Sequence, residues 1–223
     1  MKNIIKVLAL LAFALLALSP ASAQNPTYAL GVDGFSLNSP TDNELEFDIH
    51  IYQTNSPVPF EYAGGQFFFD FNTAVANGGL LTYSRVGSGL PANFEPRNPQ
   101  ISGSQLRLAV NTFPGAGNGF TGIPSTPPGI LIERMRITNT VQFAVENLNL
   151  LWRNGPANPF TKIFAYVGTT NTDITTAATH TVSNEITPLP VELASFTSGV
   201  DRNTVALKWT TSSETNNKGF EIE

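Results

Sequence analysis

Apolar and polar residues alternate along most of the chain. The clearest case is residues 44–52, where Leu45, Phe47 and Ile49 are separated by acidic residues. Because successive side chains of a strand face opposite sides of its sheet, this pattern predicts a strand with one core-facing side. Similar runs, broken by Gly, Pro or Asn about every ten residues, occur at 65–71, 80–86, 105–111, 130–138, 141–145, 148–152 and 163–167. Short strands at this spacing predict an all-β sandwich or barrel.

The first 23 residues have the layout of a secretory signal. Lys2 and Lys6 form a basic start, residues 7–18 are apolar and uncharged, and Ser19 to Ala23 end in a small-x-small pattern. The alternative is a membrane anchor, but twelve apolar residues are fewer than the ~20 that span a bilayer. We therefore expect residues 1–23 to be a signal-peptide helix, removed on export, and the protein to be secreted or held at the cell surface without spanning the membrane.

Composition narrows the function classes. The chain has 12 basic and 17 acidic residues, so without Lys2 and Lys6 the balance is 10 against 17, a net charge of −7. This argues against a nucleic-acid partner, because phosphate binding needs a basic surface. The chain has no cysteine, which excludes disulfides, thiolate metal sites and cysteine nucleophiles. A domain of about 160 residues can bury enough apolar surface without disulfides.

The pattern of breaks divides the chain after the signal into two parts. Residues 24–185 form the larger predicted sandwich, and the proline-containing residues 186–190 form a linker, since prolines hold the backbone extended. In residues 191–223, Val205, Leu207 and Trp209 alternate with more polar residues, and Phe220 and Ile222 begin a similar run. An isolated hairpin is marginal in water, so we interpret this part as the beginning of a second, truncated sandwich whose remainder lies beyond residue 223.

The C-terminal part resembles a known module. The segments LPVELASFT and VALKWTTSSETNNKGFEIE are similar to the start of a fibronectin type III-like domain found in large secreted proteins of Bacteroidota. That module often precedes a sorting domain read by the type IX secretion system. The resemblance implies that Trp209 belongs to the core of the module, and it implies export by that route.

The larger part resembles immunoglobulin-like sandwiches of the cohesin and carbohydrate-binding type. The similar segments are YAGGQFFFDFN at 62–72, ISGSQLRLAVN at 101–111 and PGILIERMRITNT at 128–140. The Asp-Pro turn of those families is replaced here by Asp70, Phe71 and Asn72. The resemblance implies a cohesin-like fold that serves in protein docking or sugar binding, and it leaves the choice between these open.

No segment carries a catalytic, cofactor-binding or metal-binding motif. His50 and His180 lack an identifiable nucleophile and orienting acid, and we interpret both as surface or hydrogen-bonded residues. Glu44, Glu46 and Asp48 lie on one strand face, where we expect a solvated polar surface rather than paired glycosidase acids or a calcium site. The glycine-rich residues 115–119 lack the strand and helix that a phosphate loop requires.

Charged residues of the 130–138 strand pose a separate question. Arg134 and Arg136 share one face, where we expect cross-strand ion pairs. Glu133 would then point inward with Met135, which is costly unless the carboxylate has a partner. A bulge at this point would relieve the conflict.

Aromatic residues supply the candidate ligand contacts. If Phe67, Phe69 and Phe71 fill the core, Phe68 faces outward, although a covering loop is the alternative. Tyr52 is a further aromatic that could be partly exposed. The candidate ligand-contact residues are Phe68, Tyr62, Tyr83 and Trp152.

These observations predict a non-catalytic binding or adhesion module of an exported, multi-domain cell-surface protein. Its partner would be a polysaccharide or another surface protein. The alternatives are a structural spacer, and an accessory module of a secreted enzyme whose catalytic domain lies beyond residue 223.

Overall fold

The computed structural model describes residues 24–37, 42–109, 113–144, 146–183, 192–201 and 204–213. Within these ranges the protein is all-β, as the alternation predicts, and its helical elements are two 3-10 turns, η1 (Thr73–Ala76) and η2 (Ala177–Thr179). No helix in the described part is long and apolar enough to cross a membrane. The expected signal peptide and linker lie outside the described residues.

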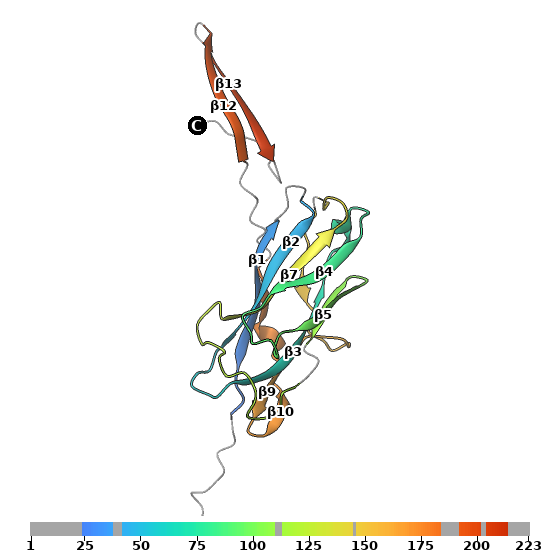
Figure 1. Ribbon diagram of the computed structural model, residues 1–223, viewed down its shortest axis with the longest axis vertical. Coiled ribbons are helices and arrows are strands. Elements are labelled where there is room, and N and C mark those ends of the chain that lie inside the picture. The colour runs from blue at the N-terminus through green and yellow to red at the C-terminus, as the bar shows by residue number, and fades with distance from the viewer. Residues whose placement is uncertain are drawn as a thin grey trace, which may run out of the picture.

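Two sheets pack face to face to form the sandwich (Figure 1). Sheet A has the strand order β11-β1-β2-β7-β4, and sheet B has the order β10-β9-β3-β6-β5, with β8 also paired to β3. The strands of sheet A are β1 (Tyr28–Leu37), β2 (Glu44–Gln53), β4 (Leu81–Gly87), β7 (Ile130–Asn139) and β11 (His180–Val182). The strands of sheet B are β3 (Glu61–Asp70), β5 (Arg97–Ser102), β6 (Gln105–Ala109), β8 (Leu151–Trp152), β9 (Lys162–Val167) and β10 (Thr170–Asp173).

The core lies between the two inner faces. Leu45, Phe47, Ile49 and Ile51 of β2 are at most 6% exposed, which confirms the inward face predicted for residues 44–52. Phe67 and Phe69 of β3 are fully buried opposite them, and Phe69 lies edge-on to Phe47 with ring centroids 6.0 Å apart.

Several elements differ from the sequence prediction. Strands β1 and β5 were not predicted. In β1 the alternation of Tyr28, Leu30 and Val32 is interrupted at Gly34 (φ +64), where the pairing with β2 shifts register. No strand covers the described residues around 141–145, and only Leu151–Trp152 of the predicted 148–152 strand pairs with a neighbour. The Thr-rich run at 169–184 contributes an edge strand to each sheet, β10 and β11.

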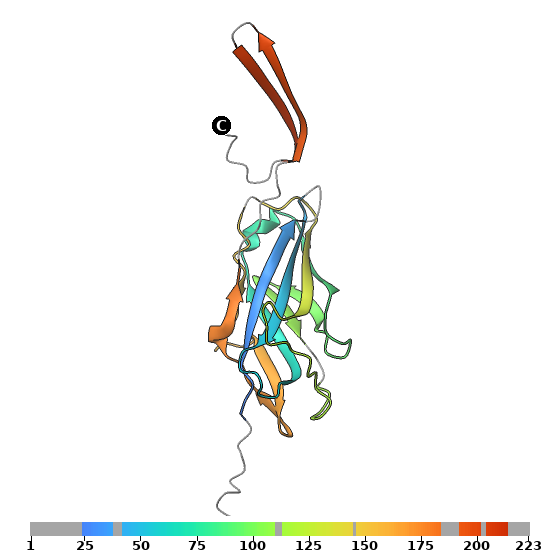
Figure 2. The same ribbon diagram turned by 90° about the vertical axis from the view of Figure 1, so that its left-hand side faces the viewer.

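A separate hairpin follows the sandwich. It consists of β12 (Glu192–Asp201) and β13 (Thr204–Ser213), which pair with each other and with neither sheet (Figures 1 and 2). Phe196, Val200 and Val205 lie on one face of this hairpin, and each is at least 60% exposed. The predicted strand at 205–210 is therefore present, and Leu207 and Trp209 on its apolar face are half-buried.

Candidate functional site

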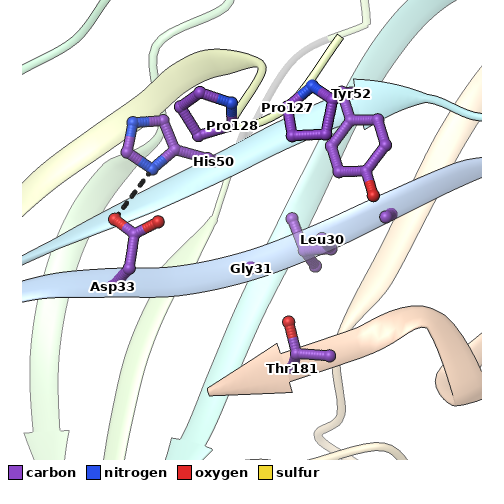
Figure 3. Close-up of a pocket in the computed structure, with 9 residues that line it drawn as sticks. Leu30, Gly31, Asp33, His50, Tyr52, Pro127, Pro128 and Thr181 are labelled. Carbon is purple, nitrogen blue, oxygen red and sulfur yellow. Dashed lines mark ion pairs between the residues drawn. The ribbon is translucent and has the colours of Figure 1, made fainter. Parts of the chain in front are cut away.

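The outer face of sheet A carries a hollow that we call the trough. Its lining residues are Ala29, Leu30, Gly31, Asp33, His50, Tyr52, Pro127, Pro128 and Thr181, and its volume is about 420 Å³. Figure 3 shows the trough with β1 as its floor, β2 on one side and β11 on the other. The two prolines come from the long loop between β6 and β7.

Register explains why the outer face is hollow here. Ala29 lies opposite Tyr52, Gly31 lies opposite His50, and Gly31 also pairs with Thr181 in the parallel ladder with β11. Two small residues on β1 are thus flanked by larger side chains of β2, and Gly31 is also flanked by Thr181 of β11. A Cβ placed on Gly31 would meet only the Thr181 hydroxyl oxygen, at 3.6 Å, which is ordinary contact. The floor of the trough is therefore open, because the side chains of β1 at positions 29 and 31 are small.

The loop that supplies the prolines is fixed at several points. The amide of Gln53 donates to the carbonyl of Pro124 (2.8 Å), while the amides of Gly117 and Gly119 donate to the Glu61 carboxylate (2.6 and 2.9 Å). The glycine-rich residues 115–119 therefore form an ordered loop over strand β3.

Asp33 and His50 form the polar end of the trough. Asp33 Oδ1 lies 3.2 Å from His50 Nδ1, and the Asp33 side chain is 45% exposed. The other carboxylate oxygen of Asp33 faces the trough (Figure 3). The hydroxyls of Tyr52 and Thr181 also point toward the floor at Leu30 and Gly31, from opposite sides. Polar groups from three strands thus converge on one small surface.

The carboxylates on the outer face of β2 are paired rather than solvated. Arg134 donates two hydrogen bonds to Asp48, both 2.7 Å, and Arg136 donates to Glu46 (2.8 Å). Glu46 and Asp48 are each only 8% exposed, so the expectation of an open, solvated row is wrong. The hydrogen bonds to Asp48 and Glu46 raise the pKa of Arg134 and of Arg136 respectively. The cross-strand ion pairs predicted for the two arginines are confirmed.

Among the described residues, one candidate ligand set for a metal ion lies on this face. Asp33, Asp48 and His50 each offer one ligand atom, and the three atoms lie within 4.8 Å of one another. However, Asp48 already places both oxygens on Arg134. A cation at this cluster would have to compete with an arginine, so the described residues favour an ion-pair network here.

His180 lies beside the trough and holds β11 in place. Its Nε2 is 2.9 Å from the Tyr28 hydroxyl, and its Nδ1 is 2.5 Å from Asn154 Oδ1. Because the amide oxygen only accepts, Nδ1 carries the proton and Nε2 accepts from Tyr28. Burial lowers the pKa of His180 to about 4, so the ring is neutral at physiological pH. This agrees with the interpretation of His180 as a hydrogen-bonded residue.

The four aromatic residues proposed as ligand contacts are all buried. Tyr62 is 0% exposed, Tyr83 7%, Phe68 8% and Trp152 9%. Tyr83 stacks on Phe47 in the core, and Trp152 packs on Phe69 and donates to the carbonyl of Thr181 (2.7 Å). Phe68 faces outward from sheet B but is covered. The structure does not bring these four side chains together on an exposed surface.

Sequence reasoning missed most of the trough. The sequence predicts His50 on the polar face of its strand and a partly exposed Tyr52, but Gly31 and Asp33 lie on β1, which it does not predict, and Thr181 lies on a three-residue edge strand. A signal for the trough would be a small residue paired with an aromatic residue, as Ala29 is with Tyr52 across β1 and β2. This pairing depends on the register of the two strands, so it cannot be read from the sequence.

Comparisons with known proteins returned no match to a family model, to a curated protein or to a solved structure. The resemblances to cohesin-type sandwiches and to fibronectin type III-like modules therefore stay predictions.

Proposed function

We propose that this chain is a non-catalytic binding or adhesion module of an exported, multi-domain cell-surface protein, and that the trough is its ligand surface. The observation that supports this most directly is the convergence of Asp33, Tyr52 and Thr181 on a hollow floored by small residues. Small-ligand sites are concave, largely apolar and fitted with a few convergent polar groups. The signal-like layout of residues 1–23 supports export.

The proposal that the module is non-catalytic rests on how its titratable groups are engaged. In the described part, the carboxylates of Glu46 and Asp48 are bound to arginines, and His180 is bound to Tyr28 and Asn154. A general acid or base needs a proton-transfer path to a substrate. Glu46, Asp48 and His180 instead direct their polar atoms at other protein groups, and Asp33, which keeps one carboxylate oxygen toward the trough, is free to accept a hydrogen bond from a ligand.

The test uses a pair of glycine substitutions in the same sheet. Gly31→Val places a side chain in the trough, whereas Gly87→Val adds the same group to β4, where a Cβ meets no atom within 4 Å. The purified chain and both variants are applied to an array of charged and uncharged glycans and to a panel of purified surface proteins. We expect at least one ligand whose binding is lost with Gly31→Val and kept with Gly87→Val.

Two results would contradict this proposal. Binding that Gly31→Val leaves unchanged would place the ligand surface elsewhere on the molecule. An absence of any ligand on both panels, with correctly folded protein, would favour the spacer alternative.

A further inference from the structure

We propose that the ligand of the trough is an uncharged saccharide, one sugar ring of which lies flat over Gly31 between Tyr52, the two prolines and Thr181. This inference rests on the proposed function and adds the chemical class of the ligand. A sugar ring presents apolar C–H faces and a perimeter of hydroxyls, so its site must offer flat apolar contact and several hydrogen-bonding groups together.

The apolar part of that requirement is met by three side chains. Tyr52 supplies a partly exposed ring on β2, and Pro127 and Pro128 are exposed on the loop above it (Figure 3). Aromatic rings and prolines are rigid, so placing a ligand against them sacrifices little side-chain entropy. The small residues Ala29 and Gly31 allow the ligand to reach the backbone of β1.

The polar part is met by groups that suit hydroxyls. Asp33 turns one carboxylate oxygen to His50 and the other to the trough, so the exposed oxygen is a strong acceptor for a ligand hydroxyl. The hydroxyls of Thr181 and Tyr52 both donate and accept. A ligand with several adjacent hydroxyls can donate to the carboxylate and can both donate to and accept from the two hydroxyls, whereas an ammonium group can only donate.

Charge argues against an acidic ligand. Among the described residues that line the trough there is no lysine or arginine, and Arg134 on this face donates hydrogen bonds to both carboxylate oxygens of Asp48. A uronate or sulfate would therefore meet the Asp33 carboxylate without a compensating cation.

The volume of about 420 Å³ falls within the range of ~300–1,000 Å³ typical of small-ligand sites.

The experiment is a titration of the isotope-labelled chain, followed by the amide resonances of Ala29, Gly31 and Thr181. The uncharged probes are cellobiose, maltose, lactose, mannobiose and N,N′-diacetylchitobiose. The charged probes are digalacturonic acid and the fully deacetylated chitosan dimer. We expect saturable shifts at the three amides with at least one uncharged disaccharide, and none with digalacturonic acid.

Variants locate the contacts. Tyr52→Ala and Asp33→Asn should each weaken binding of the responding disaccharide by about tenfold or more, and Gly31→Val should abolish it. Gly87→Val should bind as the unaltered chain does. Tyr52→Phe, which keeps the ring and removes only the hydroxyl, should bind more tightly than Tyr52→Ala.

The possible outcomes separate this inference from the proposed function. The trough could instead bind only an acidic sugar, only the amine probe or only a protein, and lose that binding in Gly31→Val. The proposed function would then hold, and the proposal of an uncharged saccharide would be wrong. If no probe and no protein binds, both are wrong. If a disaccharide shifts residues outside the trough and tolerates Gly31→Val, this site assignment is overturned.

Discussion

Glu133 is an acidic residue in the core of the sandwich. Its side chain is fully buried, and it points inward as the alternation of β7 implies. Arg85 supplies a partner for one oxygen of this carboxylate, because it donates to Glu133 Oε2 (2.8 Å), and it also contacts Glu95 in the loop after β4. The predicted bulge is present as a register shift between β2 and β7 beside Glu133, but Glu133 stays inside. Desolvation by burial raises the pKa of Glu133, with Arg85 acting against it.

Removing Arg85 should destabilise the fold. Arg85→Met leaves the Glu133 carboxylate buried without its cation, and breaking such a pair typically costs about 3 kcal/mol. Urea unfolding at neutral pH measures this loss. The loss should shrink in acid, where Glu133 takes up a proton and no longer needs a counter-ion. A loss below about 0.5 kcal/mol, the range of ordinary surface substitutions, would show that the pair contributes nothing.

His180 should make the stability of the sandwich depend on pH. Its pKa is about 4 in the folded chain and 6.5 in the unfolded reference, so the unfolded state binds more protons between these values. Stability should therefore fall as the pH drops from 6.5 to 4, by on the order of 3 kcal/mol for this group. His180→Gln should remove this component from a pH series of denaturation curves. An unchanged pH profile in the variant would contradict the burial of His180.

At the scale of elements, the loop between β6 and β7 completes the trough. It is held by the Glu61 carboxylate at its glycine-rich part and by the backbone of β2 near its end. Gly129 closes the loop with φ +97, and a Cβ there would lie 2.0 Å from the carbonyl oxygen of Ile51. The position of Pro127 and Pro128 over the trough therefore depends on the absence of a side chain at 129.

Gly129→Ala should destabilise the protein more than Gly117→Ala does. Both glycines have positive φ, which costs a residue with a Cβ about 1 kcal/mol or more, but Gly117 has no atom within 4 Å of its Cβ position. The clash at Gly129 should add about 1–3 kcal/mol, measured by thermal unfolding. Gly129→Ala should also weaken ligand binding at the trough, because the prolines move. Equal effects of the two substitutions would rule out the close approach to Ile51.

At the scale of the whole molecule, the sandwich and the hairpin differ in how their backbones are protected. Strands β2 and β7 lie inside sheet A and cover a continuous core. The hairpin β12–β13 forms a two-stranded sheet of its own, with exposed apolar side chains. Two strands without a covering layer are marginally stable in water, so the two parts should not unfold as one unit.

Hydrogen exchange should separate these two parts. The amides of Val205 to Trp209 in β13 should exchange much faster than those of Phe47 to Ile51 in β2, because opening the hairpin exposes little additional apolar surface. Mass spectrometry of the intact chain with peptide-level readout measures both. Comparable protection in the two segments would mean that the hairpin is covered by another part of the protein.

The class of fold and most of the sandwich interior follow from the local pattern of apolar and polar residues. Alternation is a local property, so the inward face of β2, the core role of Phe67 and Phe69 and the paired arginines of β7 could be predicted from neighbouring residues. Strand β1 could not, because Gly34 breaks its alternation, and β11 is too short to carry a pattern. The trough was decided only by tertiary structure. It depends on the register of β1 against β2 and β11 and on a loop that crosses from β6 to β7, and contacts between residues distant in the chain leave no periodic trace. The burial of Phe68, Tyr62, Tyr83 and Trp152 could not be predicted for the same reason, because neighbouring layers, rather than their own strands, cover these side chains.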